Sequence, residues 1–256
     1  MKNDFIYGIH TVAALLERAP ERIEALQVLE GRSDQRMQKL LSDAERASIH
    51  IVRVGRDVLD RFEVKHQGVV ALLAHNFEYR EADLKSLVQR NANPLLLILD
   101  GVTDPHNLGA CLRSADAAGV DAVIAPRDNA ASLTPVVRKV ACGAAEVIPF
   151  VAVTNLARTL RDLKDWGVWI VGTAGEADVL IYEQDFSGSI ALVMGAEGSG
   201  LRRLTREHCD FLVKLPMAGS VSSLNVSVAT GICLFEAVRQ RQCLPSPRGR
   251  GAGGEG

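Results

Sequence analysis

Three segments in the second half of the chain place polar residues directly after apolar runs, and this arrangement constrains the fold more than any other feature. The segments span residues 100–119, 191–201 and 215–238. Each segment contains or follows an apolar run that is typical of a buried strand. Gly, Asn, Ser or Glu then follow where a strand would give way to a helix. Open α/β sheets build their binding sites at such strand ends. The pattern therefore predicts that the three segments are the walls of one pocket.

Strand and helix patterns alternate regularly from residue 94 onward. The apolar spacing predicts strands over 95–99, 122–125, 147–150, 168–172, 190–194 and 211–215, and helices over 107–118, 135–142, 155–166 and 224–240. Such alternation is typical of a mainly parallel sheet that helices cover on both faces. The predicted fold class is therefore α/β.

A smaller unit precedes this domain. Residues 1–74 show patterns for helices over 9–16 and 35–47 and for strands over 23–29, 49–54 and 68–74, which predicts a small α/β/α domain. Residues 75–93 are more polar and are interpreted as a linker, with a helical stretch suggested by Leu84, Leu87 and Val88. The second domain spans 94–243, and the polar tail 244–256 is predicted to be disordered.

Composition excludes some classes of protein. No apolar stretch reaches the ~18 residues that a bilayer-spanning helix needs, and the start of the chain, with Asp4 and His10 among its apolar residues, is a poor secretory signal. We therefore expect a cytoplasmic protein that does not enter a membrane. The net charge of −2 gives no general positive field. An RNA partner would have to meet local basic patches, for which 65–67 and Arg127 are candidates.

The cysteines give no sign of a metal site. The chain has five, widely spaced, with no CxxC pair and no Cys/His cluster at zinc spacing. We expect buried free thiols and no bound metal.

The first polar segment contains two candidate site residues, each with an ordinary structural alternative. Asn107 follows Pro105 and His106 at a predicted helix start, where it would serve as an N-cap. Arg113 lies six residues further on and is either a solvated charge or a bidentate ligand for a phosphate. Spacing alone leaves both questions open.

The second and third segments are harder to explain by structure alone. The glycines around Glu197 would let a ligand approach the backbone closely, and a glutamate is an unusual turn residue there. Ser223 belongs to a serine-rich stretch typical of ordinary helix capping. Asn225 and Ser227, however, are expected one turn into a buried helix, where an unpaired polar group costs about 1–3 kcal/mol. This favours a polar partner for them.

The same residues resemble the motifs of the SpoU (TrmH-like) family of RNA 2′-O-ribose methyltransferases, within the SPOUT superfamily. Asn107 to Arg113 is similar to the NxxxxxR motif, residues 194–201 to the loop MGxEGxGL, and residues 215–229 to LPMxGxxxSLNVSxA. All three occur in order, with no substitution at a signature position, over about the last 150 residues. In the front unit, residues 7–12 (YGIHTV) and 66–71 (HQGVVA) resemble the L30e-like RNA-binding domain that is fused to such enzymes.

The resemblance implies a cofactor, a topology and an assembly that periodicity does not reveal. The cofactor would be S-adenosylmethionine, held in a C-terminal trefoil knot, and the protein would be a homodimer through the knotted domain with each active site near the interface. Cofactor contacts would come from Gly195, Leu215, Ser223 and Leu224.

The resemblance also implies catalytic roles and a substrate. The catalytic set would be Asn107, Arg113, Glu197 and Asn225. Arg113 would bind the adjacent phosphate and stabilise charge on the 2′-oxygen, because a guanidinium is a poor base. The whole chain is similar to the family's 23S rRNA enzymes, which implies as target a guanosine in the P-site loop, in naked rRNA or in a large-subunit precursor.

Two alternatives stay open at this point. The first is the same chemistry on another nucleotide, such as a 23S rRNA adenosine or a tRNA guanosine. The second is a non-catalytic rRNA-binding or ribosome-assembly protein that has kept the fold. The complete set of signature residues argues against the second.

Overall fold

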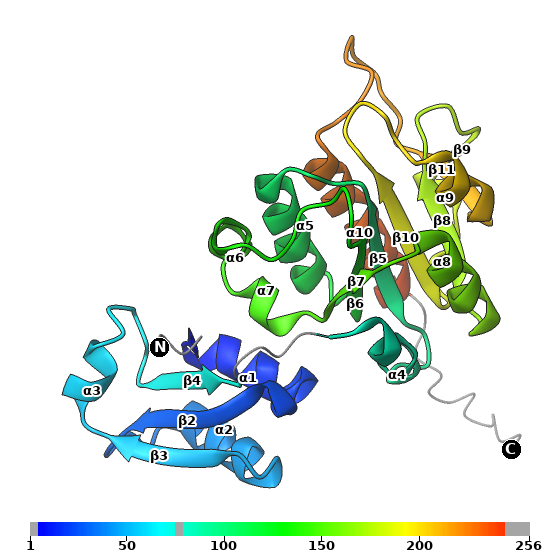
Figure 1. Ribbon diagram of the computed structural model, residues 1–256. Coiled ribbons are helices and arrows are strands. Elements are labelled where there is room, and N and C mark those ends of the chain that lie inside the picture. The colour runs from blue at the N-terminus through cyan, green and yellow to red at the C-terminus, as the bar shows by residue number, and fades with distance from the viewer. Residues whose placement is uncertain (1–4, 75–78, 244–256) are drawn as a thin grey trace, which may run out of the picture.

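The chain builds two sheets, one for each predicted domain (Figure 1). The computed structural model describes residues 5–74 and 79–243. The front sheet has the strand order β1-β4-β2-β3, with β2 and β3 parallel and β4 antiparallel to β1 and β2. Its elements are β1 (Phe5–Tyr7), α1 (Ile9–Arg18), η1 (Pro20–Arg22), β2 (Ile23–Leu29), α2 (Gln35–Arg46), β3 (His50–Val54), α3 (Arg56–Asp60) and β4 (Val69–Leu73).

The second sheet has seven strands in the order β7-β6-β5-β10-β8-β11-β9, and every pair in it is parallel. The predicted α/β class with a mainly parallel sheet is thus confirmed. Its strands are β5 (Leu95–Asp100), β6 (Ala122–Pro126), β7 (Phe150–Val153), β8 (Trp169–Thr173), β9 (Val179–Leu180), β10 (Ile190–Gly195) and β11 (Phe211–Lys214). Its helices are α5 (Pro105–Ala117), α6 (Pro135–Ala141), α7 (Ala144–Val147), α8 (Leu156–Asp165), α9 (Arg203–His208) and α10 (Val226–Cys243).

Burial explains why the central strands are almost wholly apolar. All six residues of β5 are buried, as are the first five of β10, because helices cover both faces of a parallel sheet. Helices α5, α6, α7 and α10 lie on one side of the sheet, and α8 and α9 lie on the other (Figure 1). Apolar side chains form a core on each side. The loops at the strand ends are the places left for polar groups.

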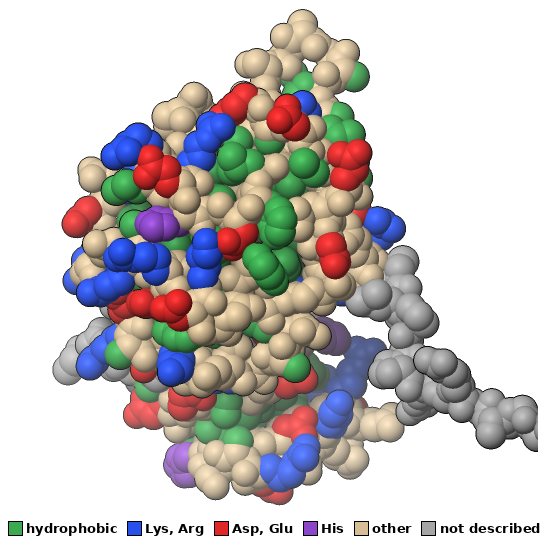
Figure 2. Space-filling model, turned by 90° about the vertical axis from the view of Figure 1, so that its right-hand side faces the viewer, with side chains coloured by type: hydrophobic (Ala, Val, Ile, Leu, Met, Phe, Trp, Pro, Cys, Tyr) green, Lys and Arg blue, Asp and Glu red, His purple; other side chains and the backbone are tan. Residues whose placement is uncertain are grey.

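The face that carries α8 and α9 has mixed charge (Figure 2). Three of its cations pair with neighbouring acids: Lys164 with Asp210 at 2.7 Å, Arg203 with Glu207 at 2.7 Å, and Arg206 with Glu176. This face therefore offers no uniform positive field to a nucleic-acid backbone, as the near-neutral net charge led us to expect.

One predicted strand is misplaced. Residues 147–150 were expected to form a strand, but Val147 ends α7 and the strand β7 begins only at Phe150. The helix restarts at Ala144 because Cys142 and Gly143 take left-handed backbone conformations that end α6. Val147 and Ile148 are apolar because they pack in the two cores beside the sheet, not because they belong to it. Short β1, α3 and β9 have too few residues to show a period and were not predicted.

The two domains touch along α1, η1 and the segment after residue 78. Helix α1 contacts α7, the hydroxyl of Tyr79 donates to Glu21 at 3.3 Å, and Arg90 pairs with Glu21 at 3.5 Å. The helical stretch suggested by the sequence is α4 (Leu84–Gln89), whose Leu84, Leu87 and Val88 are buried. Residues 75–78 and the predicted disordered tail 244–256 lie outside the described residues. Among the described helices, none combines the length and the apolar character needed to cross a bilayer.

Gly109 lets α5 and α6 approach closely. This contact sets the position of α5, the helix that carries Asn107 and Arg113. A Cβ atom at Gly109 would lie 2.7 Å from Cβ of Val140 and 2.9 Å from the carbonyl oxygen of Val137. We predict that Gly109→Ala lowers the free energy of unfolding by about 1–3 kcal/mol, because the backbone must shift to admit the methyl group.

Gly231 in α10 provides the matched control. A Cβ atom there would lie 3.7 Å from Oγ of Ser114, an ordinary contact. Gly231→Ala should therefore keep or raise stability, since alanine favours a helix by up to about 1 kcal/mol over glycine. Urea unfolding followed by circular dichroism measures both variants. Equal stability of the two variants would contradict this account of the α5–α6 contact.

Candidate functional site

The parallel register brings the ends of four strands to one edge of the sheet. Gly195 at the end of β10 lies opposite Asp100 at the end of β5, and Val213 of β11 lies opposite Thr173 of β8. The loops that leave these strands therefore gather at one place, as expected for an open parallel sheet. Two of the three polar segments leave from β5 and β10, and the third leaves from β11.

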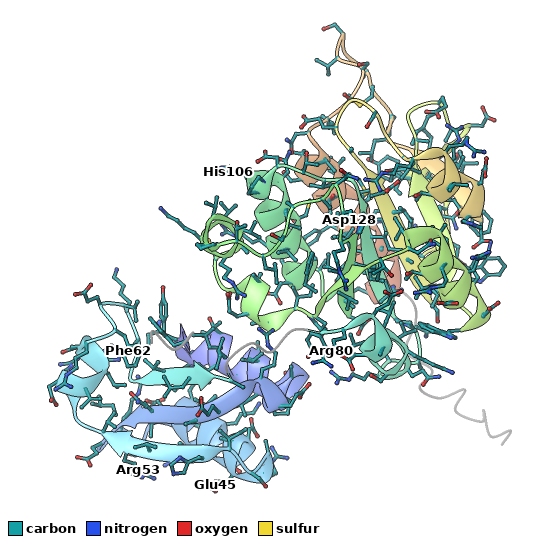
Figure 3. The ribbon with its side chains drawn as sticks, in the orientation of Figure 1. Glu45, Arg53, Phe62, Arg80, His106 and Asp128 are labelled. Atoms are coloured by element: carbon teal, nitrogen blue, oxygen red, sulfur yellow. The ribbon has the colours of Figure 1, made fainter. Side chains whose placement is uncertain are left out.

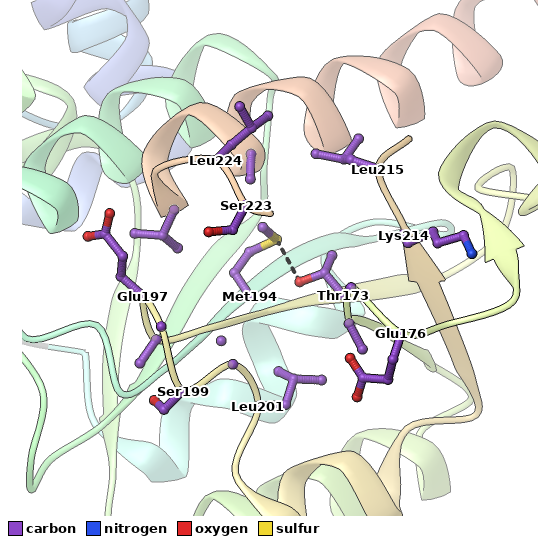
Figure 4. Close-up of a pocket in the computed structure, with 18 of the residues that line it drawn as sticks. Thr173, Glu176, Met194, Glu197, Ser199, Leu201, Lys214, Leu215, Ser223 and Leu224 are labelled. Carbon is purple, nitrogen blue, oxygen red and sulfur yellow. Dashed lines mark hydrogen bonds between the residues drawn. The ribbon is translucent and has the colours of Figure 1, made fainter. Parts of the chain in front are cut away.

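A cavity of about 450 Å³ lies between these loops. Segments 173–176, 194–201 and 213–217 line it, together with 222–224 and the start of α10 (Figure 4). The four predicted cofactor-contact residues, Gly195, Leu215, Ser223 and Leu224, all lie in this lining. Its size is that of a small-molecule site, and its walls combine apolar side chains with a few polar groups.

The glycine-rich loop is folded tightly on itself. The backbone groups of Ala196 and Gly200 exchange two hydrogen bonds, of 3.1 and 2.9 Å, and Gly198 and Gly200 have positive φ angles of 81° and 65°. A Cβ atom at Gly195 would overlap the backbone of Gly200. The glycines are thus required by this turn, which leaves backbone edges facing the cavity.

A buried carboxylate anchors the end of this loop to β5. Asp100 has no exposed surface, and its Oδ2 accepts a hydrogen bond from the backbone amide of Arg202 at 2.8 Å. The guanidinium of Arg202 lies 3.6 Å from Oδ1 of Asp100 and also donates to the carbonyl of Asn129 at 3.4 Å. Because a buried charge is stable only when it is paired, this contact ties the loop to the sheet.

Three of the predicted catalytic residues meet in a hydrogen-bonded chain. The amide of Asn107 donates to Oε2 of Glu197 at 3.3 Å, and the amide of Asn225 donates to Oδ1 of Asn107 at 2.9 Å. Oδ1 of Asn225 accepts from the backbone amide and the hydroxyl of Ser227, at 2.9 and 2.6 Å. Each of the three polar segments contributes one member. Glu197 also lines the cavity, so the chain of hydrogen bonds reaches it.

Two expectations about these residues are corrected. Asn107 is not the N-cap of α5: the helix starts earlier, and Asp104 caps it by accepting from the amide of His106 at 2.9 Å. Asn107 is instead buried one turn into the helix. Asn225 does not lie inside a buried helix, because α10 begins at Val226 and Asn225 is exposed just before it.

Arg113 does not join the other three candidates. Its side chain is exposed, is absent from the cavity lining, and places Nη1 3.6 Å from Sγ of Cys142. Six residues along an α-helix correspond to a turn of about 600°, so Asn107 and Arg113 point in different directions. The spacing of the motif therefore puts the two residues on one helix but not on one face.

The segment 173–176 contributes cavity residues that the sequence analysis missed. Thr173 and Glu176 line the cavity, as does Lys214 at the end of β11 (Figure 4), and the hydroxyl of Thr173 donates to the carbonyl of Val193 at 3.2 Å. A backbone amide and the guanidinium of Arg206 donate hydrogen bonds to the carboxylate of Glu176 and lower its pKa. The sequence contains a pattern that could have indicated them, because residues 173–176 (TAGE) follow a predicted strand, as the other three polar segments do.

The lining of the cavity suits an organic molecule with an apolar body and several polar groups. Backbone edges of the glycine-rich loop, the apolar Met194, Leu201 and Leu215, and the carboxylate of Glu176 surround it. Among residues 5–74 and 79–243, no group of three or more His, Cys, Asp or Glu side chains is placed to hold a metal ion.

Comparison with known proteins gives a consistent result. Residues 94–235 match the SpoU rRNA Methylase family, and residues 5–78 match the family described as RNA 2′-O ribose methyltransferase substrate binding. The 23S rRNA (guanosine-2′-O-)-methyltransferase RlmB of Haemophilus ducreyi is 63% identical over 92% of this chain and 97% of that protein. The protein of the same name from Escherichia coli K12 is 59% identical over 93% of this chain and 99% of its own length.

A solved structure extends the similarity to three dimensions. The SpoU methyltransferase AviRb from Streptomyces viridochromogenes, in complex with the cofactor AdoMet, superposes with a TM-score of 0.63 at 25% identity, over 93% of this chain and 90% of that one. Family match, length and motifs agree, and the chain belongs to the SpoU rRNA methylase family.

Proposed function

We propose that this protein methylates the ribose 2′-hydroxyl of a guanosine in 23S rRNA, with S-adenosylmethionine as the methyl donor. The observation that carries the proposal is the hydrogen-bonded meeting of Asn107, Glu197 and Asn225 beside one cavity, in a chain about 60% identical over nearly its whole length to enzymes named for this reaction. The finer target, a guanosine in the P-site loop, follows from the resemblance of the whole chain to those enzymes.

The cavity residues fit this cofactor. Gly195, Leu215, Ser223 and Leu224 would hold it, with Leu201 and Met194 against its apolar parts and the ion pair of Glu176 and Arg206 beside its polar groups. When bound, S-adenosylmethionine would supply a methyl group attached to a cationic sulfur, which is the leaving group when an oxygen nucleophile takes the methyl group. The chain's own task is to align that nucleophile and to help remove its proton.

The hydrogen-bonded chain of Asn107, Glu197 and Asn225 suits a role in positioning the substrate. The amide oxygen of Asn107 accepts a hydrogen bond from Asn225, and its amide nitrogen donates one to Glu197. Each of the three side chains therefore fixes the orientation of the next. Fixed polar groups at a reacting centre lower the barrier because they need not reorganise during the reaction. We assign Asn107, Glu197 and Asn225 to holding the ribose and the cavity loops in register.

Arg113 is assigned to the RNA. Its guanidinium is exposed on α5 and bound only weakly, to the Cys142 thiol, so it is free to bind the phosphate next to the target ribose. A guanidinium is a poor base at neutral pH, and stabilising negative charge on the 2′-oxygen is the role its fork of donors supports.

We also propose a homodimer through the C-terminal domain, with each active site near the interface. Helix α10 buries one face against α5 but exposes Val228, Ile232 and Phe235 by 51, 36 and 50%. These residues stand at positions i, i+4 and i+7, so they form one apolar stripe. An apolar stripe of this kind on a helix otherwise packed in a core favours contact with a second copy.

The trefoil knot and the front-domain assignment belong to the same proposal. After β11 at one side of the sheet, the chain returns past the 173–176 and 194–201 loops before α10 docks against α5, a path compatible with a knot. We assign 1–74 to an L30e-like RNA-binding domain, 75–93 to a linker and 94–243 to the methyltransferase domain. Because 23S rRNA is the substrate, the proposal places the enzyme in the cytoplasm.

Methyl transfer to unmodified 23S rRNA tests the proposal directly. We expect incorporation of label from S-adenosylmethionine and a single primer-extension stop, sensitive to ribose methylation, at a guanosine in the P-site loop. A stop at an adenosine, or incorporation into tRNA only, would keep the chemistry and overturn the substrate. No incorporation into naked rRNA or large-subunit precursors would overturn the enzyme and leave an rRNA-binding protein.

Arg113→Lys tests the assignment of the arginine. Lysine keeps the charge but loses the planar fork, so we expect kcat to fall about 100-fold, while the Kd for S-adenosylmethionine stays unchanged because Arg113 does not line the cavity. The same change at the exposed Arg161 of α8 is the control and should leave both constants unchanged. Near-normal turnover by Arg113→Lys would refute the role.

Phe235→Glu tests the dimer. A carboxylate at the C-terminal end of the apolar stripe opposes burial of this face, so sedimentation should show a dimer for the unaltered protein and a monomer for the variant. Leu204→Glu, on the exposed side of α9 across the sheet, is the matched control and should remain dimeric. A monomeric unaltered protein would contradict the proposal.

A further inference from the structure

Two motif segments of the front domain lie outside the cavity of the second domain, yet they are joined to each other. Residues 7–12 and 66–71 meet because β1 pairs with β4, with Tyr7 opposite Val70. The backbone amide of Gly8 donates to the carbonyl of Val69 at 3.2 Å, and the amide of Ile9 donates to Oε1 of Gln67 at 3.4 Å. The start of α1 and the loop before β4 therefore form a single surface.

The loop before β4, residues 62–68, is held rigidly. His66 is buried and bonds in two directions, with Nδ1 accepting from the amide of Gly68 at 2.9 Å and Nε2 lying 3.0 Å from Oδ1 of Asp60. Arg32 donates to the carbonyl of Gln67. Glu63 and Gln67 take left-handed conformations, with φ of 54° and 50°, which are unfavourable for residues with a side chain and are typical of functional loops.

This rigid loop separates two hollows that carry exposed polar and aromatic groups. One hollow has a volume of about 600 Å³. Its lining residues are Tyr7, Gly8, His10, Thr11, Glu63, Val64, Lys65 and Gln67. The other, of about 270 Å³, lies across the loop and includes Arg32, Arg56 and Lys65. Lys65 lines both hollows, so a chain of phosphates could pass beside it.

An exposed ring is supported within the first hollow. The Tyr7 side chain is 42% exposed, and its ring lies 6.4 Å from that of Phe5, which in turn packs edge-on against Phe62 at 4.7 Å. Figure 3 labels Phe62, the first residue of this loop. A supported aromatic face next to cations and an amide is the combination that binds unstacked bases of single-stranded nucleic acid.

We propose that these two hollows hold unpaired nucleotides of the RNA substrate, with one base stacked on Tyr7 and the adjoining phosphates against Lys65 and Arg56. The proposal rests on the proposed function for the class of substrate and adds where the front domain grips it. At such a site the RNA is recognised by its shape and by base stacking and not by a general positive field, which fits a chain with a net charge of −2.

The position of the first hollow relative to Arg113 supports a shared RNA path. Cγ2 of Thr11, which lines the hollow, is 3.4 Å from the place where a Cβ on Gly143 would stand. Gly143 follows Cys142, whose sulfur is 3.6 Å from the Arg113 guanidinium. An RNA loop bound to the front domain at this hollow would thus lie on the side of the second domain where Arg113 is exposed.

RNA affinity separates stacking from charge at this site. The probes are a full-length unmodified 23S rRNA transcript and an unstructured 12-nucleotide RNA, with Kd measured by filter binding over a range of salt concentrations. Tyr7→Ala should weaken binding of both about 10-fold, while Tyr7→Trp should keep it. Lys65→Gln should reduce the slope of log K against log salt by about one.

Arg53→Gln is the matched control for the loss of one cation. Arg53 is exposed on β3, at the other edge of the front sheet from β1 and Phe62 (Figure 3), so affinity and salt slope should equal those of the unaltered protein. Calorimetric binding of S-adenosylmethionine should be the same in all variants, because these residues do not line the cofactor cavity.

Unchanged affinity in both Tyr7→Ala and Lys65→Gln would overturn this site. The result is independent of the methylation assay: failure of the unaltered protein to methylate rRNA overturns the proposed function, while the RNA affinities still decide the site. If the site is correct and the enzyme active, Tyr7→Ala should raise KM for rRNA and leave kcat nearly unchanged, whereas a fold defect would lower kcat and cofactor binding as well.

Discussion

The pairing of β10 between β5 and β8 is the constraint on which the site depends. Because the three strands are parallel and in register, Gly195 stands opposite Asp100, and the loops that follow each strand emerge together. Asp100 then fastens the glycine-rich loop through Arg202, and Glu197 in that loop reaches Asn107 on α5. A shift of one residue between β5 and β10 would turn these side chains toward the opposite face and would break the contacts that join the first and second polar segments.

The apolar pattern of the sequence predicted the second sheet well because buried parallel strands leave little choice of residue. It failed where local signals allow two solutions. Asp104 and Asn107 are both good capping residues, three positions apart, and only the packed structure shows that Asp104 caps α5 while Asn107 is buried against Glu197. The apolar run after Gly143 could be helix or strand, and it contains the end of α7 and then β7.

The grouping of the site residues was predictable in part. Three separated breaks after apolar runs indicated one pocket, and Gly195, Leu215, Ser223 and Leu224 do share a cavity. Thr173 and Glu176 were missed although they follow the same kind of break, because no distinctive motif accompanies them. The six-residue spacing already places Asn107 and Arg113 on different faces of one helix, but the contact of Arg113 with Cys142 depends on the turn after α6, which the motif does not reveal.

The two domains divide the work along physical lines. The second domain offers a small cavity lined by both apolar and polar groups, while the front domain offers a rigid loop with an exposed ring and scattered cations. This division explains how a chain of nearly neutral net charge can act on RNA: recognition comes from shape and stacking at a few points.

The central claim is that segments 173–176, 194–201 and 215–224 form one cofactor site. Hydrogen–deuterium exchange with and without S-adenosylmethionine tests it most directly. The account predicts that all three segments gain protection together, at the same cofactor concentration, while the front sheet is unchanged. Protection confined to one segment, or located in the front domain, would contradict it.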